Sequence, residues 1–296
     1  MKSELSILIP NYNNRCVELV TKLHQMAMHV AGLQFEIIVA DDGSTLPETL
    51  VVNRNINALP NARLIERKQN IGRAAIRNFL AAQARFCWLL FIDSGMSVES
   101  ETFLNSYLHT DADVVYGGYS VTGDAAKLAG NLRYCYETKS LPHHTLARRM
   151  AAPYQNFHTS NFLISRRLML ALPFDERFRN YGYEDVFFGK QLKEAGVTIT
   201  HIYNPIRFSE FESNASFVAK TEESLQTLAR FKQELTGFSR LLVIAEKLNH
   251  WHVAWLVSFV FKHNKKRWRC KLCSNHPSLL LFNLYKTGYL LQVCNL

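Results

Sequence analysis

Acidic and basic side chains follow apolar segments in the first half of the chain. Asp41 and Asp42 end the run FEIIVADD, and Asp93 ends the run CWLLFID. Arg73 and Arg77 stand four residues apart in NIGRAAIRN, and Asn11 lies in PNYNN at the end of another apolar run. Ionised carboxylates only accept hydrogen bonds, so they suit the N–H and O–H groups of a ligand. These residue types predict a polar crevice on an apolar scaffold.

A second group of reactive side chains occurs in GYED, residues 182–185. Glu184 and Asp185 stand at a predicted helix start that follows a flexible glycine. A carboxylate in this place can act as a general base toward an attacking hydroxyl, which typically accelerates a reaction by about 10²–10⁴-fold. The alternative is that the two acids only stabilise the dipole of the helix that they begin.

The elements that must position these residues alternate between strand and helix. Helices are predicted at 15–32 and 71–84, and strands at 5–10, 35–44, 62–68, 87–93 and 112–121. Such alternation indicates an α/β fold with a mostly parallel sheet and helices on both faces. Ligands of open α/β sheets bind beyond the carboxyl ends of the strands. Neither a phosphate loop nor the G-x-G-x-x-G fingerprint is present, which excludes ordinary NTPases and dinucleotide-binding dehydrogenases.

The second half of the chain divides into a segment of mixed strands and helices and a tail. Residues 121–155 are basic and weakly patterned, and we expect a loop-rich connection over the site. A strand at 161–165, a helix from about 183 to 196 and a long helix from about 213 to 234 follow. We expect one domain at 1–236, whose two halves are residues 1–120 and 121–236, and a helical tail at 237–296.

The tail holds most of the net charge of +9. Residues 238–296 contain nine Lys and Arg against one acid, Glu246. Two amphipathic helices are predicted, and one apolar face includes Trp251, Trp255 and Phe259. Aromatic and basic residues in this arrangement suit an anionic membrane surface. The alternative is a helical hairpin packed on the catalytic domain or in a dimer, and nucleic acid is not expected because no binding module accompanies the charge.

The location follows from what the sequence lacks. The N-terminal apolar run is too short for a signal peptide, and no apolar stretch reaches the roughly 18–20 residues that span a bilayer. We expect a cytoplasmic protein that associates peripherally with the inner face of the membrane. The six cysteines have no disulfide-framework spacing. Cys270 and Cys273 form a C-x-x-C pair, for which reduced thiols are favoured over a zinc site.

The motifs SILIPNYNN, FEIIVADDGST, NIGRAAIRN and FIDSGM resemble the nucleotide-sugar half of family 2 glycosyltransferases with the GT-A fold. The stretch from NFLIS to KQLKEAG resembles their acceptor half, in the form shared with galactosyltransferase-like C-terminal domains. The resemblance covers about residues 4–235, and it implies that residues 1–120 are the nucleotide-sugar-binding half and residues 121–236 the acceptor-binding half of the domain. It implies a hexosyltransferase-like enzyme that transfers a sugar from a UDP-linked donor to a saccharide or lipid-linked glycan acceptor. The configuration at the anomeric carbon would be inverted in the transfer.

The resemblance also implies roles for individual residues. Asp41 or Asp42 would bind uracil and ribose, and Asp185 would be the catalytic base while Glu184 holds an acceptor hydroxyl. Asn161 and Tyr183 would bind the acceptor, with core packing as the alternative. The residues implied in nucleotide-sugar binding are Pro10, Asn11, Tyr12, Asp41, Asp42, Arg73, Arg77 and Asp93.

The chain departs from the family pattern where a metal would bind. The family's Asp-x-Asp motif holds Mg²⁺ or Mn²⁺ by its last member, but here Asp93 is followed by Gly95. A histidine that often completes the metal shell is replaced around Phe208. Three accounts are open: Arg207 neutralises the diphosphate without metal, Asp93 alone still holds magnesium, or the domain is a non-catalytic nucleotide-sugar-binding scaffold. Other candidate cations are Arg133, Arg148 and Arg149.

Overall fold

The computed structural model describes residues 1–294 and divides into two compact units. The first unit comprises residues 1–120, 144–179 and 188–210. The second comprises residues 121–143, 180–187 and the chain from 211 onward. The units interleave along the sequence, whereas the segments expected at 1–120, 121–236 and 237–296 are continuous. Those functional segments stay a prediction.

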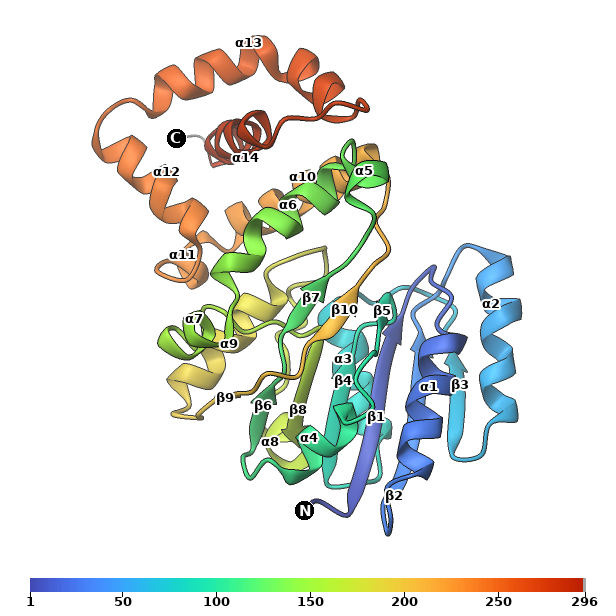
Figure 1. Ribbon diagram of the computed structural model, residues 1–296. Helices are drawn as coiled ribbons and strands as arrows, with labels where there is room; N and C mark the ends of the chain where they lie inside the picture. Colours follow the sequence, from blue (N-terminus) through green and yellow to red (C-terminus); the bar gives the residue numbers. More distant parts are fainter. Residues whose placement is uncertain (295–296) are drawn as a thin grey trace. The chain divides into compact units, whose positions relative to one another are not determined.

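The first unit is built on a seven-stranded sheet of order β3-β2-β1-β4-β8-β6-β9 (Figure 1). β1 pairs in parallel with β2 and β4, and β2 pairs in parallel with β3. β8 is antiparallel to both β4 and β6. The sheet is therefore mostly parallel, as predicted. Its strands are β1 Glu4–Asn11, β2 Gln34–Asp41, β3 Ala62–Glu66, β4 Trp88–Ile92, β6 Val114–Tyr116, β8 Asn161–Ser165 and β9 Thr200–His201.

Helices cover both faces of this sheet. Alternate side chains of β1, such as Ile7, are fully buried in one cluster with Val20 and Leu23 of α1, and each such side chain contributes about 1.5–3 kcal/mol of burial. α4 joins this cluster, whereas α3 and α8 contact each other on the opposite face (Figure 1). The helices of this unit are α1 Val17–Met28, α2 Pro47–Asn53, η1 Arg54–Ala58, α3 Arg73–Gln83, α4 Phe103–His109, α7 Leu146–Ala151 and α8 Arg166–Ala171.

The strand expected at 112–121 is interrupted. It ends as β6 at Tyr116, and a new strand, β7 Tyr119–Val121, joins β5 Met96–Ser97 and β10 Ile206–Phe208 in a three-stranded sheet. The break falls at Gly117 and Gly118. A Cβ atom on Gly117 would lie 2.4 Å from the Tyr107 hydroxyl, and Gly118 has a φ of +87°. Backbone crowding therefore sets the end of β6.

The prediction of a loop-rich segment at 121–155 is wrong. The structure has α5 Ala125–Leu128, α6 Leu132–Ser140, η2 Leu141–His143 and α7 in this range. The Asp124 carboxylate, the Asn131 amide oxygen and the Thr145 hydroxyl each accept a hydrogen bond from a first-turn amide of the helix that follows. Side-chain caps therefore fix helices whose apolar pattern is too short to recognise.

The second unit is helical, and its tail differs from the expected pair of helices. The predicted apolar face breaks at His252, whose φ is +56°, so the tail has three helices instead of two. The basic cluster lies within the second of them rather than between helices. The remaining helices are α9 Glu184–Glu194, which begins in this unit, α10 Asn214–Arg230, α11 Lys232–Leu235, α12 Arg240–His250, α13 Ala254–Leu272 and α14 Leu279–Val293. None of the described helices combines the length and apolarity that a membrane crossing requires.

Candidate active site

Three strands of the parallel sheet deliver polar residues to one edge. Asn11 ends β1 and is in register with Asp41, which ends β2. Asp93 follows β4, which pairs in parallel with β1 on its other side. Because the carboxyl ends of parallel strands meet at one edge of a sheet, these residues lie at the same edge. The structure thus brings together the predicted donor-binding residues of the first unit.

Asp41 is buried and fixes the turn after β2. Its carboxylate accepts hydrogen bonds from the Ser44 amide at 2.8 Å, from the Ser44 hydroxyl at 2.6 Å and from the Asn11 side chain at 2.9 Å. Tyr12, beside this network, is 47% exposed. Asp41 therefore stabilises the loop at the carboxyl edge of the sheet, while the exposed Tyr12 ring is available to a ligand.

Asp42 connects the end of β2 to the loop before α3. Its two oxygens accept hydrogen bonds from the amides of Ile71 and Gly72 at 3.0 and 3.1 Å. Burial raises the pKa of Asp42 above its ordinary value, against the lowering effect of these amides. Gly72 has a φ of +92°, and a Cβ there would lie 2.4 Å from the Arg179 carbonyl oxygen. The start of α3 is thus held at a defined place.

Asp93 lies between two arginines of α3. Arg77 Nη2 is 2.6 Å from Asp93 Oδ1, and Arg73 Nη2 is 3.2 Å from Asp93 Oδ2. Arg77 is 1% exposed, whereas the side chains of Asp93 and Arg73 are 21% and 40% exposed. The four-residue spacing places both guanidinium groups on one face of the helix. The result is a positively charged cluster whose outer member, Arg73, faces solvent.

The residues around Asp93 do not fit the metal shell that the family resemblance implies. Phe208 is in register with Met96, the residue after Gly95, so both departures lie on neighbouring strands, β10 and β5. Gly95 has no side chain and Phe208 has no donor atom, so neither residue can ligate a metal. Both oxygens of Asp93 contact guanidinium groups, and no group of three or more His, Cys, Asp or Glu gathers in a metal-binding arrangement among residues 1–294. Asp93 is thus a poor single ligand for Mg²⁺ or Mn²⁺.

The cations expected to replace the metal have partners within the protein. Arg207 forms an ion pair with Glu99. Arg149 is buried, and its guanidinium donates hydrogen bonds to several backbone carbonyls, including that of Ile202 at 3.0 Å. In the second unit, Arg133 is 2.8 Å from Glu137. Arg148 is exposed on α7. Arg133 and Arg149 therefore stabilise the folded structure through these contacts. Arg207 would have to break its ion pair with Glu99 before it could bind a phosphate.

Asn161 is placed in the interior of the first unit, which argues against the expected acceptor contact. It is 0% exposed. Its amide oxygen accepts a hydrogen bond from the Tyr107 hydroxyl at 2.6 Å, and its amide nitrogen donates to the carbonyls of Gly118 and Asn204. These bonds join β8 to the chain around β6. The alternative of core packing is therefore the better interpretation of this residue.

The GYED turn belongs to the second unit. Gly182 and Tyr183 have φ values of +93° and +68°, and a Cβ on Gly182 would lie 2.7 Å from Ser224 Cβ. Burial raises the pKa of the Tyr183 phenol, which is hydrogen bonded with Ser239. Glu184 is buried at the start of α9, and Asp185 is partly buried. Glycine adopts a positive φ freely, but Tyr183 is strained in this conformation, and such strain is often found at functional sites.

Asn13 is a site residue that the sequence reasoning missed. Its amide oxygen accepts hydrogen bonds from the backbone of Thr45 at 2.7 Å and of Leu46 at 3.1 Å. Its φ is +54°. The side chain joins the loop after β1, which contains Tyr12, to the loop after β2. The signal was the run of asparagines after Pro10, because asparagine tolerates this backbone conformation.

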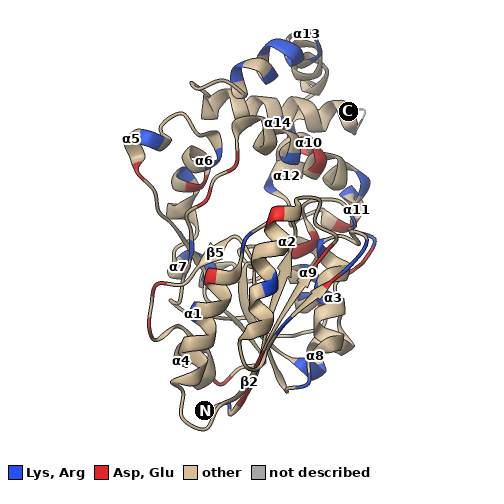
Figure 2. Ribbon diagram, turned by 90° about the vertical axis from the view of Figure 1, so that its right-hand side faces the viewer, with Lys and Arg blue, Asp and Glu red and all other residues tan. Residues whose placement is uncertain are grey.

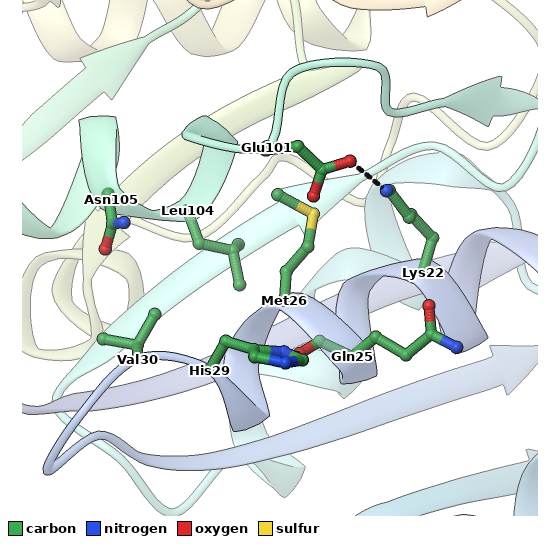
Figure 3. A pocket seen from close by; sticks show the side chains of 8 residues that line it. All are labelled: Lys22, Gln25, Met26, His29, Val30, Glu101, Leu104 and Asn105. Atoms are coloured by element: carbon green, nitrogen blue, oxygen red, sulfur yellow. Dashed lines mark hydrogen bonds and ion pairs between the residues drawn. The ribbon is translucent and has the colours of Figure 1, made fainter.

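A separate hollow lies between α1 and the region of α4 (Figure 3). An ion pair between Lys22 and Glu101 closes one side of it, and Met26 and Leu104 form part of its apolar lining. None of the predicted site residues lines it. We therefore place the candidate active site at the carboxyl edge of the sheet and not in this hollow.

Comparison with known proteins gives consistent matches. A family model for glycosyl transferase family 2 matches residues 6–171. An uncharacterized glycosyltransferase of Haemophilus influenzae is 25% identical over 242 residues, 79% of this chain and 90% of the relative. S. aureus TarS 1–349 in complex with UDP has a TM-score of 0.52 at 19% identity, over 100% of this chain and 90% of that chain. Mannosyltransferase PcManGT from Pyrobaculum calidifontis, in complex with GDP-Man and Mn²⁺, has a TM-score of 0.55 at 15% identity, over 99% and 81%. The structural likenesses confirm the expected GT-A fold.

Proposed function

The chain belongs to glycosyl transferase family 2, and from this premise we propose that it transfers a sugar from a UDP-linked donor to a saccharide acceptor, free or lipid-linked. The observation that carries the proposal is the cluster of Arg73, Arg77 and Asp93 at the carboxyl edge of the sheet. Guanidinium groups match phosphate oxygens in charge and geometry. The UDP bound by TarS, a protein of the same fold, supports the choice of base.

The transfer inverts the anomeric carbon with Asp185 as general base. The acceptor hydroxyl oxygen attacks the anomeric carbon, and its proton passes to the Asp185 carboxylate. The bond from that carbon to the diphosphate breaks, and its electron pair stays on the diphosphate oxygen. Glu184 holds a second hydroxyl of the acceptor, and because it is 5% exposed its carboxylate must become accessible for this contact. The strained backbone of Tyr183, directly before the two acids, supports this role because such strain is often found at functional sites.

Arginines neutralise the leaving diphosphate, with little or no dependence on metal. Arg73 is 40% exposed and already lies 3.2 Å from Asp93, so its guanidinium can bridge that carboxylate and a phosphate oxygen. Arg207 supplies a second cation once it leaves Glu99. Charge that develops on the leaving group must be stabilised for the transfer to be fast. Gly95 and Phe208 in place of metal ligands support this arrangement.

Calorimetric titration of UDP, with Mn²⁺ and then with EDTA, tests the donor site. We expect UDP binding to survive EDTA and to weaken by about 10- to 100-fold in Arg73→Ala, since a hydrogen bond to a charged group is worth about 1.5–3 kcal/mol. Arg63→Ala is the matched control, because Arg63 is similarly exposed on β3 and contacts the Gln83 carbonyl. Binding seen only with Mn²⁺ would instead mean that Asp93 holds the metal. No binding under either condition would contradict a UDP-linked donor.

A non-catalytic nucleotide-sugar-binding scaffold is the second candidate, because Gly95 and Phe208 remove two groups that the family uses in turnover. The two functions differ in one measurement. An enzyme releases UDP from UDP-sugars when incubated with saccharide acceptors, and Asp185→Asn stops the release. If the chain is a scaffold, the wild-type protein and Asp185→Asn bind UDP with the same affinity, and neither releases UDP from a UDP-sugar.

A further inference from the structure

Exposed apolar side chains gather on one face of α13 in the second unit. Trp255 is 66% exposed and Phe259 is 56% exposed, and Leu256 and Val260 beside them are 47% and 39% exposed. We call these four residues the apolar face. Trp251, at the turn before α13, is 65% exposed. Large apolar side chains this close together on a surface usually mark an interaction site.

The apolar face is not part of the core that α13 forms with the rest of its unit. That core uses the opposite side of the helix, where Phe261 is 0% exposed. A Cβ on Gly288 of α14 would lie 2.6 Å from Phe261, and the Phe261 ring meets Tyr285 edge-on at 5.2 Å between centroids. α13 is therefore already anchored on α14, and the apolar face is left for a partner.

Basic residues continue the same face toward the end of α13. Lys262, Lys266 and Arg267 are exposed, and at 100° per residue they lie within the sector that contains Trp255 and Phe259. Figure 2 shows Lys and Arg along this helix. α13 has no acidic residue, and residues 238–296 contain one, Glu246. The partner that complements this face therefore combines an apolar layer with negative charge.

We infer that the apolar face and the basic residues of α13 dock on an anionic lipid bilayer. Trp255 and Phe259 would enter the boundary between headgroups and acyl chains, and Lys262, Lys266 and Arg267 would contact lipid phosphates. The helix lies on the membrane surface in this arrangement. The inference rests on α13 alone and stands whether or not the chain transfers sugar.

Sedimentation of the full chain with vesicles tests the inference. We expect binding to vesicles of phosphatidylcholine with phosphatidylglycerol, and binding at least about tenfold weaker to phosphatidylcholine alone. The emission of Trp251 and Trp255 should shift to shorter wavelength in the first case. Equal binding to both kinds of vesicle, or binding to neither, would overturn the inference.

Two variants separate the apolar and the charged contributions. Trp255→Ser with Phe259→Ser should weaken vesicle binding about tenfold or more. Lys262→Gln with Lys266→Gln and Arg267→Gln should reduce binding to the neutral-vesicle level. Val51→Ser with Leu170→Ser is the matched control, since these apolar residues are also exposed, at 63% and 46%, in the first unit. Unchanged circular dichroism and an unchanged midpoint of urea denaturation in all three variants show that each protein is folded.

The competing occupant of this face is a second copy of the chain. Light scattering without lipid distinguishes it from a bilayer. A monomer supports membrane docking. A dimer that dissociates on Trp255→Ser with Phe259→Ser would overturn it, because the apolar face would then be buried between copies.

Discussion

At the scale of single residues, the acids of the candidate site differ in what surrounds them. Asp41 and Asp42 are buried and bond to the backbone of neighbouring loops. Asp93 is partly exposed and forms ion pairs with Arg73 and Arg77. The first two therefore build the edge of the sheet, whereas Asp93 and Arg73 are placed where a ligand can reach them. Sequence position alone cannot separate these roles, because all three acids follow apolar strands.

The sharpest prediction for a single residue concerns Asp185. Asp185→Asn removes the carboxylate that accepts the proton but keeps the size of the side chain. We expect sugar transfer to fall by about 10²–10⁴-fold, the usual worth of a general base, while UDP binding is unchanged. Transfer rates and calorimetry measure the two quantities. Asp111→Asn, at an exposed position of the first unit, is the control, and equal rates in both variants would remove Asp185 from the mechanism.

At the scale of elements, the sequence predicts the strands that bear the site. The runs before Asn11, Asp42 and Asp93 are long, apolar and bounded by polar residues, so β1, β2 and β4 fall where expected. The helices α5, α6 and α7 in 121–155 were missed because each begins at a capping side chain and none has a long apolar stripe. The break after Tyr116 depends on contacts with Tyr107 and Arg149, which no local pattern reveals.

Two glycines of the first unit give a matched test of what holds the start of α3. Gly72→Ala should lower the free energy of unfolding by more than Gly196→Ala, measured by urea denaturation. Both alanines would adopt a positive φ, and Gly72 in addition has a ψ of 165°, a combination essentially restricted to glycine. Only at Gly72 would the Cβ also overlap a carbonyl, at 2.4 Å, while nothing lies within 4 Å at Gly196. Equal losses would mean that the loop before α3 shifts freely.

At the scale of the whole molecule, one buried histidine makes stability depend on pH. Burial and the nearby Arg149 lower the pKa of His201 from its ordinary value of 6.5 to about 4. His158 and the Tyr116 ring also face it. The folded protein therefore holds His201 neutral at pH values where the unfolded chain binds a proton. Its stabilising contribution is present above pH 6.5 and is lost as the pH falls toward 4.

Urea denaturation at pH 7 and pH 5 measures this dependence. We expect the wild-type protein to lose more unfolding free energy between the two values than His201→Gln, which has no group to titrate there. His109→Gln is the control, because His109 is exposed at the end of α4. The same loss in His201→Gln as in the wild type would assign the pH dependence to other groups.

The interleaved second unit has a consequence for the newly made chain. The amide of Tyr181 donates a hydrogen bond to Glu223, and Gly182 packs against Ser224, so α10 supports the turn that carries Asp185. The ribosome adds α10 some thirty residues after that turn. A nascent chain can thus complete most of its sheet while the proposed base is still without support. Activity would then arise late in synthesis, after the first unit is largely folded.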